Sequence, residues 1–340
     1  QAGAWQNQMW AVGDTGDENL HMNDAQKVAD QVGKDAGENF LLRRIFPDIY
    51  TVTQEAKGAT YPEATEKLKQ AMQHGALVFN YNGHGSPDRI SHKFLLNKEE
   101  MLANESEARP VWIFASCEIT PYDQVSQDLG RNALYCPNGP AVAVLCASRS
   151  VYANYNRALN MGFVHFAFSK DAEGRRYTLG DALRLTKCEL LKNTTVSIGT
   201  DQTVNKMKYA LLGDPALTLA YPDAGLRIDS VNGQPVSGAD ARFTLPIGSK
   251  VRLSGSVVRE GDEAVDTQFN GGLSATVLAP LQTLTCKGAG NSKVSPLVYT
   301  DYTNTIYEGE VAVVDGRFTV EFVVPRGLTF SDEVSVVSLY

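Results

Sequence analysis

His84 and Cys117 carry the two side chains of this sequence whose types and positions best fit covalent catalysis. His84 lies between two glycines directly after the apolar run at residues 76–81, and Cys117 follows the apolar run at residues 111–116. A cysteine thiolate is a strong nucleophile, and a nearby imidazole assists its formation by accepting the thiol proton. If the two runs are neighbouring strands, the pattern predicts a Cys/His dyad. The alternative interpretation is a histidine in a tight turn and a small cysteine in the core.

The backbone around this pair indicates where the negative charge of a reaction intermediate would be stabilised. Glycine lets the chain approach a substrate closely and leaves amide groups free to point at it. The N–H groups of Gly85 and Cys117 are therefore candidate donors of an oxyanion hole. Glu118, which follows the cysteine, is a candidate for contacting substrate or orienting the loop.

Alternating apolar segments predict the elements that would position these residues. Up to residue 222, short apolar strands alternate with helical periodicity, which is typical of a mostly parallel sheet with helices on both faces. The predicted strands are residues 8–13, 48–52, 76–81, 111–116, 141–147 and 217–220. The predicted helices run from Asn23 to Gly33, from Pro62, from Thr178, and over residues 202–212. In such α/β folds, functional groups gather where loops leave the carboxyl ends of the strands.

The pattern changes after residue 222 to alternating strands joined by turn residues, with no convincing helix. One example is Val314-Asp315-Gly316-Arg317, a hairpin signal between two β-rich runs. This stretch is typical of an immunoglobulin-like β-sandwich, complete or truncated, with a long polar loop at residues 283–304. We therefore predict an α/β domain at residues 1–222 and an all-β domain at residues 223–340.

Composition and charge exclude several classes of protein. The 340 residues carry a net charge of −8 and no Lys/Arg cluster, which argues against nucleic acid as a partner. No apolar run approaches the length of a membrane-spanning helix. Five cysteines without a C-x-x-C pair fit neither a zinc site nor a disulfide framework, and Cys136, Cys146 and Cys188 are predicted core residues. The sequence has no N-terminal Met or signal peptide, so we expect a processed protein or part of a longer chain.

Several segments, in the same order, resemble the gingipain family of cysteine peptidases. They are Gly13–Met22, Asn80–Ser86, Phe114–Cys117, Ala141–Ser148 and Leu211–Pro215. The resemblance is closest to the PorU-type branch, the sortase-like signal peptidases of the type IX secretion system. Its most specific part is the Gly-His-Gly segment with a Ser-Cys pair, the cysteine standing 33 positions after the histidine. The resemblance implies a caspase-like, mostly parallel sheet followed by an immunoglobulin-like domain.

The resemblance also implies roles for individual residues. Cys117 matches the nucleophile, His84 matches the catalytic histidine, and the N–H groups of Gly85 and Cys117 match the oxyanion donors. Ser148 and Arg149 lie in the loop that forms the specificity pocket of the family, and Glu118 joins them as a candidate substrate contact. This loop holds no tryptophan and no acidic residue, unlike that of the arginine-specific members. A broader or small-residue preference therefore fits better than one for arginine or lysine.

An acidic residue after the first strand often supports the histidine in this family. Asp14 is the best match, with Asp17 and Glu18 as rivals. A solvated acidic turn, or a calcium-binding loop built from these three carboxylates, is an equally good interpretation. The chemistry itself requires no cofactor, so structural calcium is the one metal that the sequence suggests. His92 could line the site, although a surface-loop histidine is the plainer interpretation, and His21 has no obvious partner.

The expected setting follows from the same resemblance. It implies an extracytoplasmic bacterial peptidase of the outer membrane or cell surface that removes C-terminal sorting domains from type IX secretion cargo. Its partners would be these protein substrates, outer-membrane secretion components, and a surface glycolipid amine if the enzyme also carries out transpeptidation. The alternatives are a secreted digestive endopeptidase of gingipain type and a non-catalytic cell-surface binding module.

Overall fold

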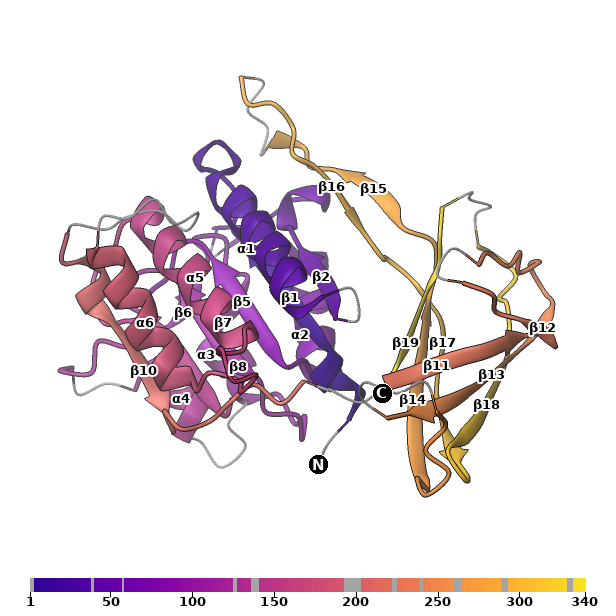
Figure 1. Cartoon of the computed structure of the whole chain (residues 1–340). Coiled ribbons are helices and arrows are strands. Elements are labelled where there is room, and N and C mark those ends of the chain that lie inside the picture. The colour runs from indigo at the N-terminus through magenta and orange to yellow at the C-terminus, as the bar shows by residue number, and fades with distance from the viewer. Residues whose placement is uncertain are drawn as a thin grey trace. The chain divides into compact units, whose positions relative to one another are not determined.

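The structure is a computed structural model of the whole chain (Figure 1). It describes residues 3–37, 40–56, 58–124, 127–135, 141–192, 203–221, 225–238, 241–259, 264–288, 293–328 and 333–340. Contacts between residues divide the chain into two compact units. The first contains Gln8–Ala220 and Leu284–Tyr299, and the second contains Ala2–Asn7, Tyr221–Thr283 and Thr300–Tyr340. Within the described residues, no helix is long and apolar enough to cross a membrane.

A six-stranded sheet forms the centre of the first unit. Its strand order is β10-β9-β8-β5-β1-β2, and the strands pair in parallel except β10, which is antiparallel to β9 at one edge. The strands are β1 (Gln8–Gly13), β2 (Leu41–Ile45), β5 (Val78–Asn82), β8 (Val111–Ala115), β9 (Ala143–Ala147) and β10 (Tyr209–Gly213). All residues of β5, β8 and β9 are buried, as is typical of parallel strands covered on both faces. The predicted mostly parallel sheet is confirmed.

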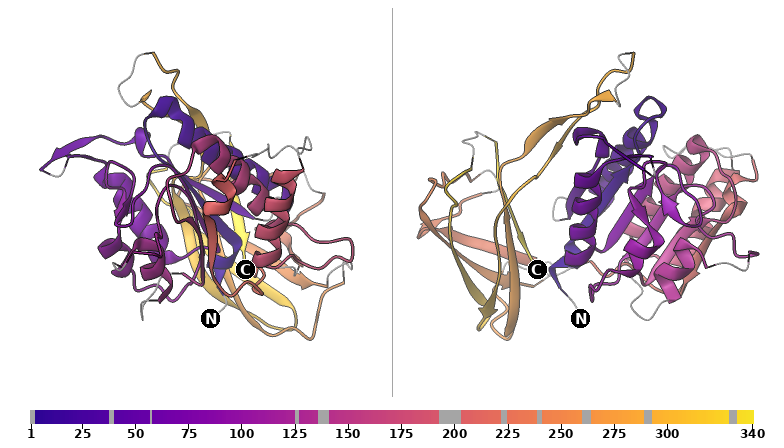
Figure 2. Two further views of the ribbon diagram at one scale, coloured as in Figure 1. Left: turned by 90° about the vertical axis from the view of Figure 1, so that its left-hand side faces the viewer. Right: turned by 180° about the vertical axis from the view of Figure 1, so that it is seen from behind.

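Helices cover both faces of this sheet (Figure 2). They are α1 (Leu20–Ala36), α2 (Pro62–His74), α3 (Lys98–Leu102), α4 (Leu129–Tyr135), α5 (Ala153–Phe168) and α6 (Leu179–Leu191). Helix α5 packs against both α1 and α6, whereas Leu68 of α2 and Leu129 of α4 pack in one core with Trp112 of β8. As predicted, Pro62 opens α2, and the Thr178 side chain caps α6 by accepting a hydrogen bond from the Asp181 N–H.

Shorter elements complete the first unit. They are the 3₁₀ helices η2 (Asp17–Asn19), η3 (Pro47–Ile49) and η4 (Asn205–Lys208), the strand pairs β3 (Thr53–Glu55) with β4 (Gly58–Thr60) and β6 (Arg89–Ile90) with β7 (Leu96–Asn97), and β15 (Gln282–Thr285) with β16 (Val298–Asp301), a pair shared with the second unit. Apart from Gln282, the β15–β16 pair falls within residues 283–304, which were predicted to be a loop, so that prediction is wrong. The contact-based division of the chain falls after Ala220, near the predicted boundary, but it joins residues 284–299 to the first unit.

Two antiparallel sheets form most of the second unit, in the orders β12-β11-β13-β18 and β17-β14-β19. The elements are η1 (Ala4–Asn7), β11 (Gly225–Val231), β12 (Gln234–Pro235), β13 (Lys250–Val258), β14 (Gly271–Leu278), β17 (Thr305–Val313), β18 (Arg317–Val323) and β19 (Val336–Leu339). Leu253 and Val320 of the first sheet share one core with Val277 of the second. Asp315 and Gly316 both have positive φ, 49° and 69°, so the predicted hairpin turn is confirmed. The immunoglobulin-like topology stays a prediction.

Three predicted elements of the first unit are wrong. Residues 48–52 are not a strand, because β2 lies upstream and Pro47, which has no N–H for a strand ladder, opens η3 instead. The described part of segment 202–212 forms η4 and then β10, since pairing with β9 overrides its helical periodicity. Residues 217–220 make one isolated bridge, through Thr218. Helix α5 has no counterpart in the predicted elements.

Candidate active site

Three neighbouring strands end in register at the carboxyl edge of the central sheet. Gly13 of β1 pairs with Asn82 of β5, and Asn82 pairs with Ala115 of β8. His84 and Cys117 therefore each stand two residues beyond a paired strand end. The predicted adjacency of the two strands is confirmed, and the loop after β1, which carries the acidic residues, leaves the same edge.

Gly85 brings the histidine loop against the cysteine loop. A Cβ atom at this position would collide with Ser116 Oγ, lie 2.7 Å from Ile119 Cδ1 and lie 3.1 Å from the carbonyl oxygen of Cys117. Neither the Gly85 N–H nor the Cys117 N–H has an acceptor among the backbone hydrogen bonds of the described residues. Both amides are thus available for the predicted oxyanion hole, a role that stays a prediction.

Gly85→Ala is expected to separate these two loops while keeping the Gly85 N–H. Forcing a methyl group into a packed site costs about 1–3 kcal/mol, and a displacement of about 1 Å in an active site can cost on the order of 100-fold in rate. We expect kcat/KM for a cleaved peptide to fall roughly 10- to 100-fold. Gly272→Ala is the matched control, because a Cβ atom there meets nothing within 4 Å. Equal activity of the two variants would contradict the close approach.

The imidazole of His84 has a carboxylate partner. Its Nε2 lies 2.6 Å from Asp17 Oδ2, and the His84 side chain is 39% exposed. The same carboxylate oxygen lies 3.2 Å from Nε2 of His21, which is the first-turn neighbour of Asp17 at i, i+4. Partial burial raises the pKa of Asp17, but the hydrogen bonds and charges of His84 and His21 outweigh burial and lower it overall. Asp17 is therefore an anion that can hold one nitrogen of the His84 ring.

Two further histidines surround the His84 ring. The ring centroid of His92 lies 4.2 Å from that of His84, and the centroid of His21 lies 5.0 Å away, both in edge-on arrangements. His21 is buried, and burial lowers its pKa. From the sequence, His92 was interpreted as a surface-loop histidine that could line the site, and His21 had no obvious partner. They lie beside His84 because the segments after β1 and β5 come together when the protein folds. The spacing of these histidines in the sequence does not predict this.

Asp14, the best match in the sequence for the acidic residue that supports the histidine, does not contact the imidazole of His84 in the hydrogen bonds of the described residues. Its buried carboxylate accepts hydrogen bonds from the His84 backbone N–H (3.2 Å), the Ser91 hydroxyl (2.6 Å) and the Thr15 N–H (2.8 Å). The Tyr81 hydroxyl lies 3.2 Å from the same carboxylate. Asp14 thus binds the backbone that carries the histidine, whereas the rival candidate Asp17 contacts the imidazole.

The backbone conformation after Asp14 explains why Asp17, and not Asp14, reaches the His84 ring. Gly16 has a φ of 91°, and the following residues Asp17, Glu18 and Asn19 all have positive φ, between 44° and 65°. Left-handed conformations are uncommon outside glycine, so a run of them is not expected from residue type alone. The resulting tight turn directs Asp17 toward the ring and starts α1 immediately afterwards.

Cys117 is held by the loop after β9. Its Sγ donates to the Val151 carbonyl (3.3 Å), and the Val151 N–H points back at Sγ (3.4 Å). The next residue, Glu118, has a φ of 49°, and its carboxylate accepts a hydrogen bond from Ser150 Oγ (2.8 Å). This left-handed residue turns the chain sharply directly after Cys117.

The three predicted substrate contacts, Glu118, Ser148 and Arg149, lie in the loops after β8 and β9 and differ in how far they are buried. Glu118 and Arg149 belong to the surface beside Cys117, where Arg149 forms an ion pair with Asp123 (2.6 Å). Ser148 is buried and its hydroxyl donates to the Lys208 carbonyl at the end of η4, so this side chain packs inside the protein. Contact with substrate stays a prediction for all three residues.

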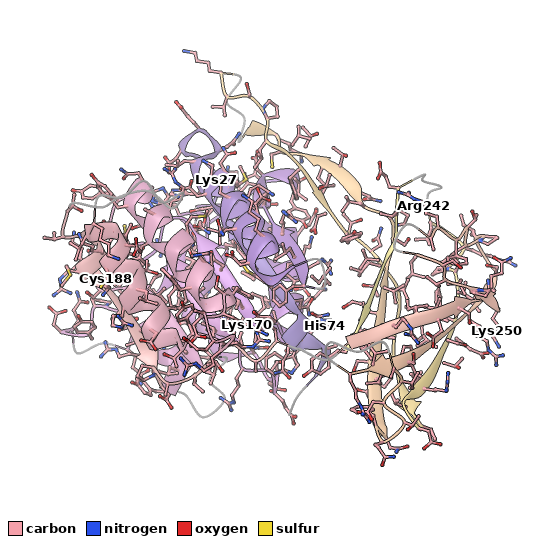
Figure 3. The ribbon with its side chains drawn as sticks, in the orientation of Figure 1. Lys27, His74, Lys170, Cys188, Arg242 and Lys250 are labelled. Atoms are coloured by element: carbon pink, nitrogen blue, oxygen red, sulfur yellow. The ribbon has the colours of Figure 1, made fainter. Side chains whose placement is uncertain are left out.

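The other described cysteines are in settings unlike that of Cys117. Burial raises the pKa of Cys146 and the pKa of Cys286 to about 12 each, so both thiols stay protonated at neutral pH. Cys188 is exposed on α6 (Figure 3), contrary to the predicted core position. The prediction for Cys136 lies outside the described residues. Cys117 is accordingly the half-buried thiol that stands at the strand edge with the histidine.

A buried asparagine network supports the strand that leads to His84. Asn160 of α5 exchanges hydrogen bonds with Asn80 (2.7 and 2.8 Å) and donates to Asn82 (3.0 Å). Asn82 also donates to Asn80 (2.8 Å). Fully satisfied buried networks of this kind hold elements in one arrangement. The asparagines at alternate positions of an otherwise apolar strand were the available signal, and the sequence interpretation did not use it.

Residues 284–299, here called the arm, contact the start of α1 beside the Asp17 turn. The Asn19 side chain donates to the Ser295 carbonyl (2.9 Å), and the sulfur atoms of Cys286 and Met22 lie 3.9 Å apart. The Gly288 N–H donates to the Asp48 carboxylate (2.6 Å). A segment 265 residues or more after the turn thus helps to fix it, which local sequence reasoning does not detect.

The described residues bring together one group of potential metal ligands at this site. Ligand atoms of Asp17, His21 and His84 all lie within 4.8 Å of one another. The group shares only Asp17 with the predicted calcium loop, in which Asp14 instead accepts hydrogen bonds from the Thr15 N–H, the His84 N–H and the Ser91 hydroxyl. Calcium in that loop stays a prediction.

Comparison with known proteins agrees with this geometry. Residues 1–220 match the model of peptidase family C25. Among solved structures, the chain is similar to the Arg-specific cysteine proteinase gingipain R (RgpB), at 12% identity and a TM-score of 0.49, in a match that covers 99% of this chain and 67% of that one. Latent PorU from Porphyromonas gingivalis is 26% identical at a TM-score of 0.32, covering 60% of this chain and 18% of its own. No curated protein matches significantly.

The fold is that of an α/β protein with a mostly parallel central sheet, and the family match over residues 1–220 gives it the class of a cysteine peptidase. On the match over residues 1–220, the chain belongs to peptidase family C25, the gingipain family. The resemblance stated from the motifs is thereby confirmed.

Proposed function

We propose that this chain is a cysteine endopeptidase in which Cys117 attacks the peptide carbonyl and His84 transfers the proton. The observation that carries the proposal is the register of β5 with β8, which places both residues at equivalent positions beyond neighbouring strand ends. Membership of family C25 supports the same reaction class. The contact between the two loops at Gly85 supports it independently.

The contacts of His84 suggest the path of the proton. Because Asp17 contacts Nε2, the other ring nitrogen, Nδ1, is the one that accepts the Sγ proton. The sulfur then bonds to the carbonyl carbon, and the oxyanion accepts hydrogen bonds from the Gly85 and Cys117 N–H groups. The imidazolium, stabilised by Asp17, gives its proton to the departing amine, which leaves a thioester on Cys117. Water or a primary amine resolves the thioester and releases the thiol.

Trapping the thioester tests the reaction directly. We expect an activated peptide ester to add one acyl group to the purified chain, located on Cys117 by peptide mass mapping. His84→Gln should slow this step by about 10²-fold or more, whereas Cys188→Ala, which changes an exposed thiol on α6, should leave it unchanged. An adduct that forms equally on other cysteines, or not at all, would favour a non-catalytic binding module.

The substrate class is the finer part of the proposal. We infer removal of C-terminal sorting domains from type IX secretion cargo, at the bacterial cell surface and with an outer-membrane secretion complex as partner. The support is the resemblance of the motifs to the PorU-type branch and the character of the loop after β9. The loop carries Arg149, which pairs with Asp123, and the carboxylate of Glu118 accepts a hydrogen bond from Ser150, so the nearby acidic groups already have partners in the chain.

Mass spectrometry of secreted proteins from a strain carrying Cys117→Ala tests this role. Cargo that keeps its C-terminal domain in the variant, and loses it in wild type, is the expected result. Wild-type cargo with a new amide at its carboxyl end would show transpeptidation, and a free carboxylate would show hydrolysis. Normally trimmed cargo in the variant strain would exclude the sorting role and favour a digestive peptidase.

A further inference from the structure

A second histidine beside the Asp17–His84 pair has no task in the proposed reaction. Orienting an imidazole requires one acceptor on one ring nitrogen, and Asp17 supplies it at 2.6 Å from Nε2. His21 nevertheless directs its own Nε2 at the same carboxylate oxygen, at 3.2 Å, from a side chain that is almost fully buried. Two imidazole nitrogens and one carboxylate oxygen therefore converge on one point.

This donor set is that of a borderline transition metal. Imidazole nitrogen and carboxylate oxygen are the ligands of catalytic and regulatory zinc, whereas calcium and magnesium prefer oxygen alone. Ligand atoms at about 2.0–2.1 Å from a tetrahedral zinc ion stand about 3.3 Å apart. Two of the separations here, 2.6 Å for His84 Nε2 and 3.2 Å for His21 Nε2 from Asp17 Oδ2, are shorter than this value, and all three atoms lie within 4.8 Å of one another, so a small movement of the side chains gives the spacing of a zinc site.

The elements that carry the three ligands also suit a metal site. Asp17 and His21 lie on the η2 turn and the first turn of α1, four residues apart, so their relative positions are fixed by backbone hydrogen bonding. His84 comes from the loop after β5, and its ring is 39% exposed, so a small rotation can open the 2.6 Å contact to the spacing that a metal needs. Solvent can supply the remaining ligand.

We propose that Asp17, His21 and His84 form a reversible zinc site that switches the peptidase off. Zinc would bind the lone pair of His84 at Nε2, and a neutral imidazole bound through one nitrogen carries its proton on the other. Nδ1 would then be a donor, with no lone pair to accept the proton of Cys117. The ion would also withdraw Asp17 from the ring. Inhibition rests on the proposed function, whereas binding of the metal does not.

Isothermal calorimetry with Zn²⁺ on the full chain tests binding, and peptide cleavage at the same zinc concentrations tests inhibition. We expect one zinc ion per chain, and a parallel weakening of both effects by at least about 10-fold in His21→Gln, consistent with loss of one ligand. His74→Gln is the matched control, because His74 closes α2 and is exposed (Figure 3). Calcium at the same concentrations should have no effect.

Two further measurements separate this site from capture of zinc by the nucleophile. Cys117→Ala should bind zinc as wild type does, and the chain loaded with Co²⁺ should show no thiolate-to-metal charge-transfer band. If His21→Gln unfolds, His84→Gln replaces it in the calorimetry, since that ring is partly exposed. Zinc binding that survives both histidine variants, or that is lost in Cys117→Ala, overturns the site. Stoichiometric, His21-dependent binding to a chain without peptidase activity would uphold the site and reject the proposed function.

Discussion

Cys117→Ala is expected to abolish peptide cleavage, with a fall in kcat/KM of roughly 10⁴-fold or more, because no other group can form the thioester. The variant should fold normally. The Cys117 side chain is only half-buried, and its described contacts are the two weak sulfur hydrogen bonds to Val151. Cleavage assays with wild type and variant at equal concentration measure the loss, and equal melting temperatures show that it is not caused by unfolding.

The reactivity of the thiols gives this prediction a second readout. Iodoacetamide at neutral pH should label Cys117 faster than Cys188, although Cys188 is the more exposed of the two. The reason is that His84 can accept the thiol proton of Cys117, whereas Cys188 lies on the outer surface of α6. Cys146 and Cys286 should react only after unfolding, since burial raises the pKa of each to about 12. Labelling of Cys188 before Cys117 would contradict the dyad.

The sequence alone was sufficient to place His84 and Cys117 after neighbouring strands, because the strands that precede them are fully buried. Strands β5 and β8 have helices on both faces, so each reads as a nearly continuous apolar run that ends where the functional loop begins. Strand β1 was predicted with its observed bounds for the same reason. Glycines at 83 and 85 marked the sharp loop, and the spacing of His84 and Cys117 then followed from two parallel neighbours.

The edge strands β2 and β10 lack the continuous apolar run that marked the central strands in the sequence. Strand β2 carries Arg43 and Arg44 and is mostly half-buried, so its sequence lacks the apolar run of a central strand. Strand β10 is an antiparallel edge strand with a half-buried centre. In both cases the pairing partner, which lies far away in the sequence, decides the structure.

Helix α5 was missed for a different reason. Its buried face includes Asn156 and Asn160, which break the apolar periodicity that predicts a helix. Those side chains are satisfied only after folding, when Asn160 meets the asparagines of β5 and Asn156 accepts from Asn205 (3.1 Å). A buried polar network is a tertiary property, and its members look like surface residues in a sequence.

The choice between acidic residues was beyond the sequence as well. Asp14 and Asp17 stand in the same short loop, and only the run of positive φ angles decides which carboxylate reaches the ring. The two residues consequently have separable contributions. One holds the loop backbone from inside the protein, and the other holds the imidazole at the surface, which makes their asparagine variants a matched pair.

Asp17→Asn is expected to lower kcat on the order of 10²-fold, with little change in melting temperature. An asparagine can still accept a hydrogen bond from Nε2, but it carries no charge to stabilise the imidazolium. The Asp17 side chain is half exposed, and the amide oxygen of an asparagine can still accept a hydrogen bond from a histidine nitrogen, so little stability should be lost. Because contact with the histidines lowers the folded-state pKa of Asp17, the stability that its carboxylate adds is present above its ordinary pKa. That contribution is lost as the pH falls through the lower value.

Asp14→Asn should show the opposite pattern. One buried oxygen would be replaced by an NH₂ group that faces donors, leaving hydrogen-bond groups of the His84 loop unsatisfied at a cost of about 2 kcal/mol. For a unit of this size the melting temperature should fall by about 4–8 °C, while the pH profile of the folded enzyme keeps its shape. Asp17→Asn should instead lower kcat with little change in melting temperature, since the imidazolium of the proposed reaction loses its counter-charge. If Asp14→Asn lowers kcat at an unchanged melting temperature and Asp17→Asn only lowers the melting temperature, then Asp14 and not Asp17 supports the His84 imidazole.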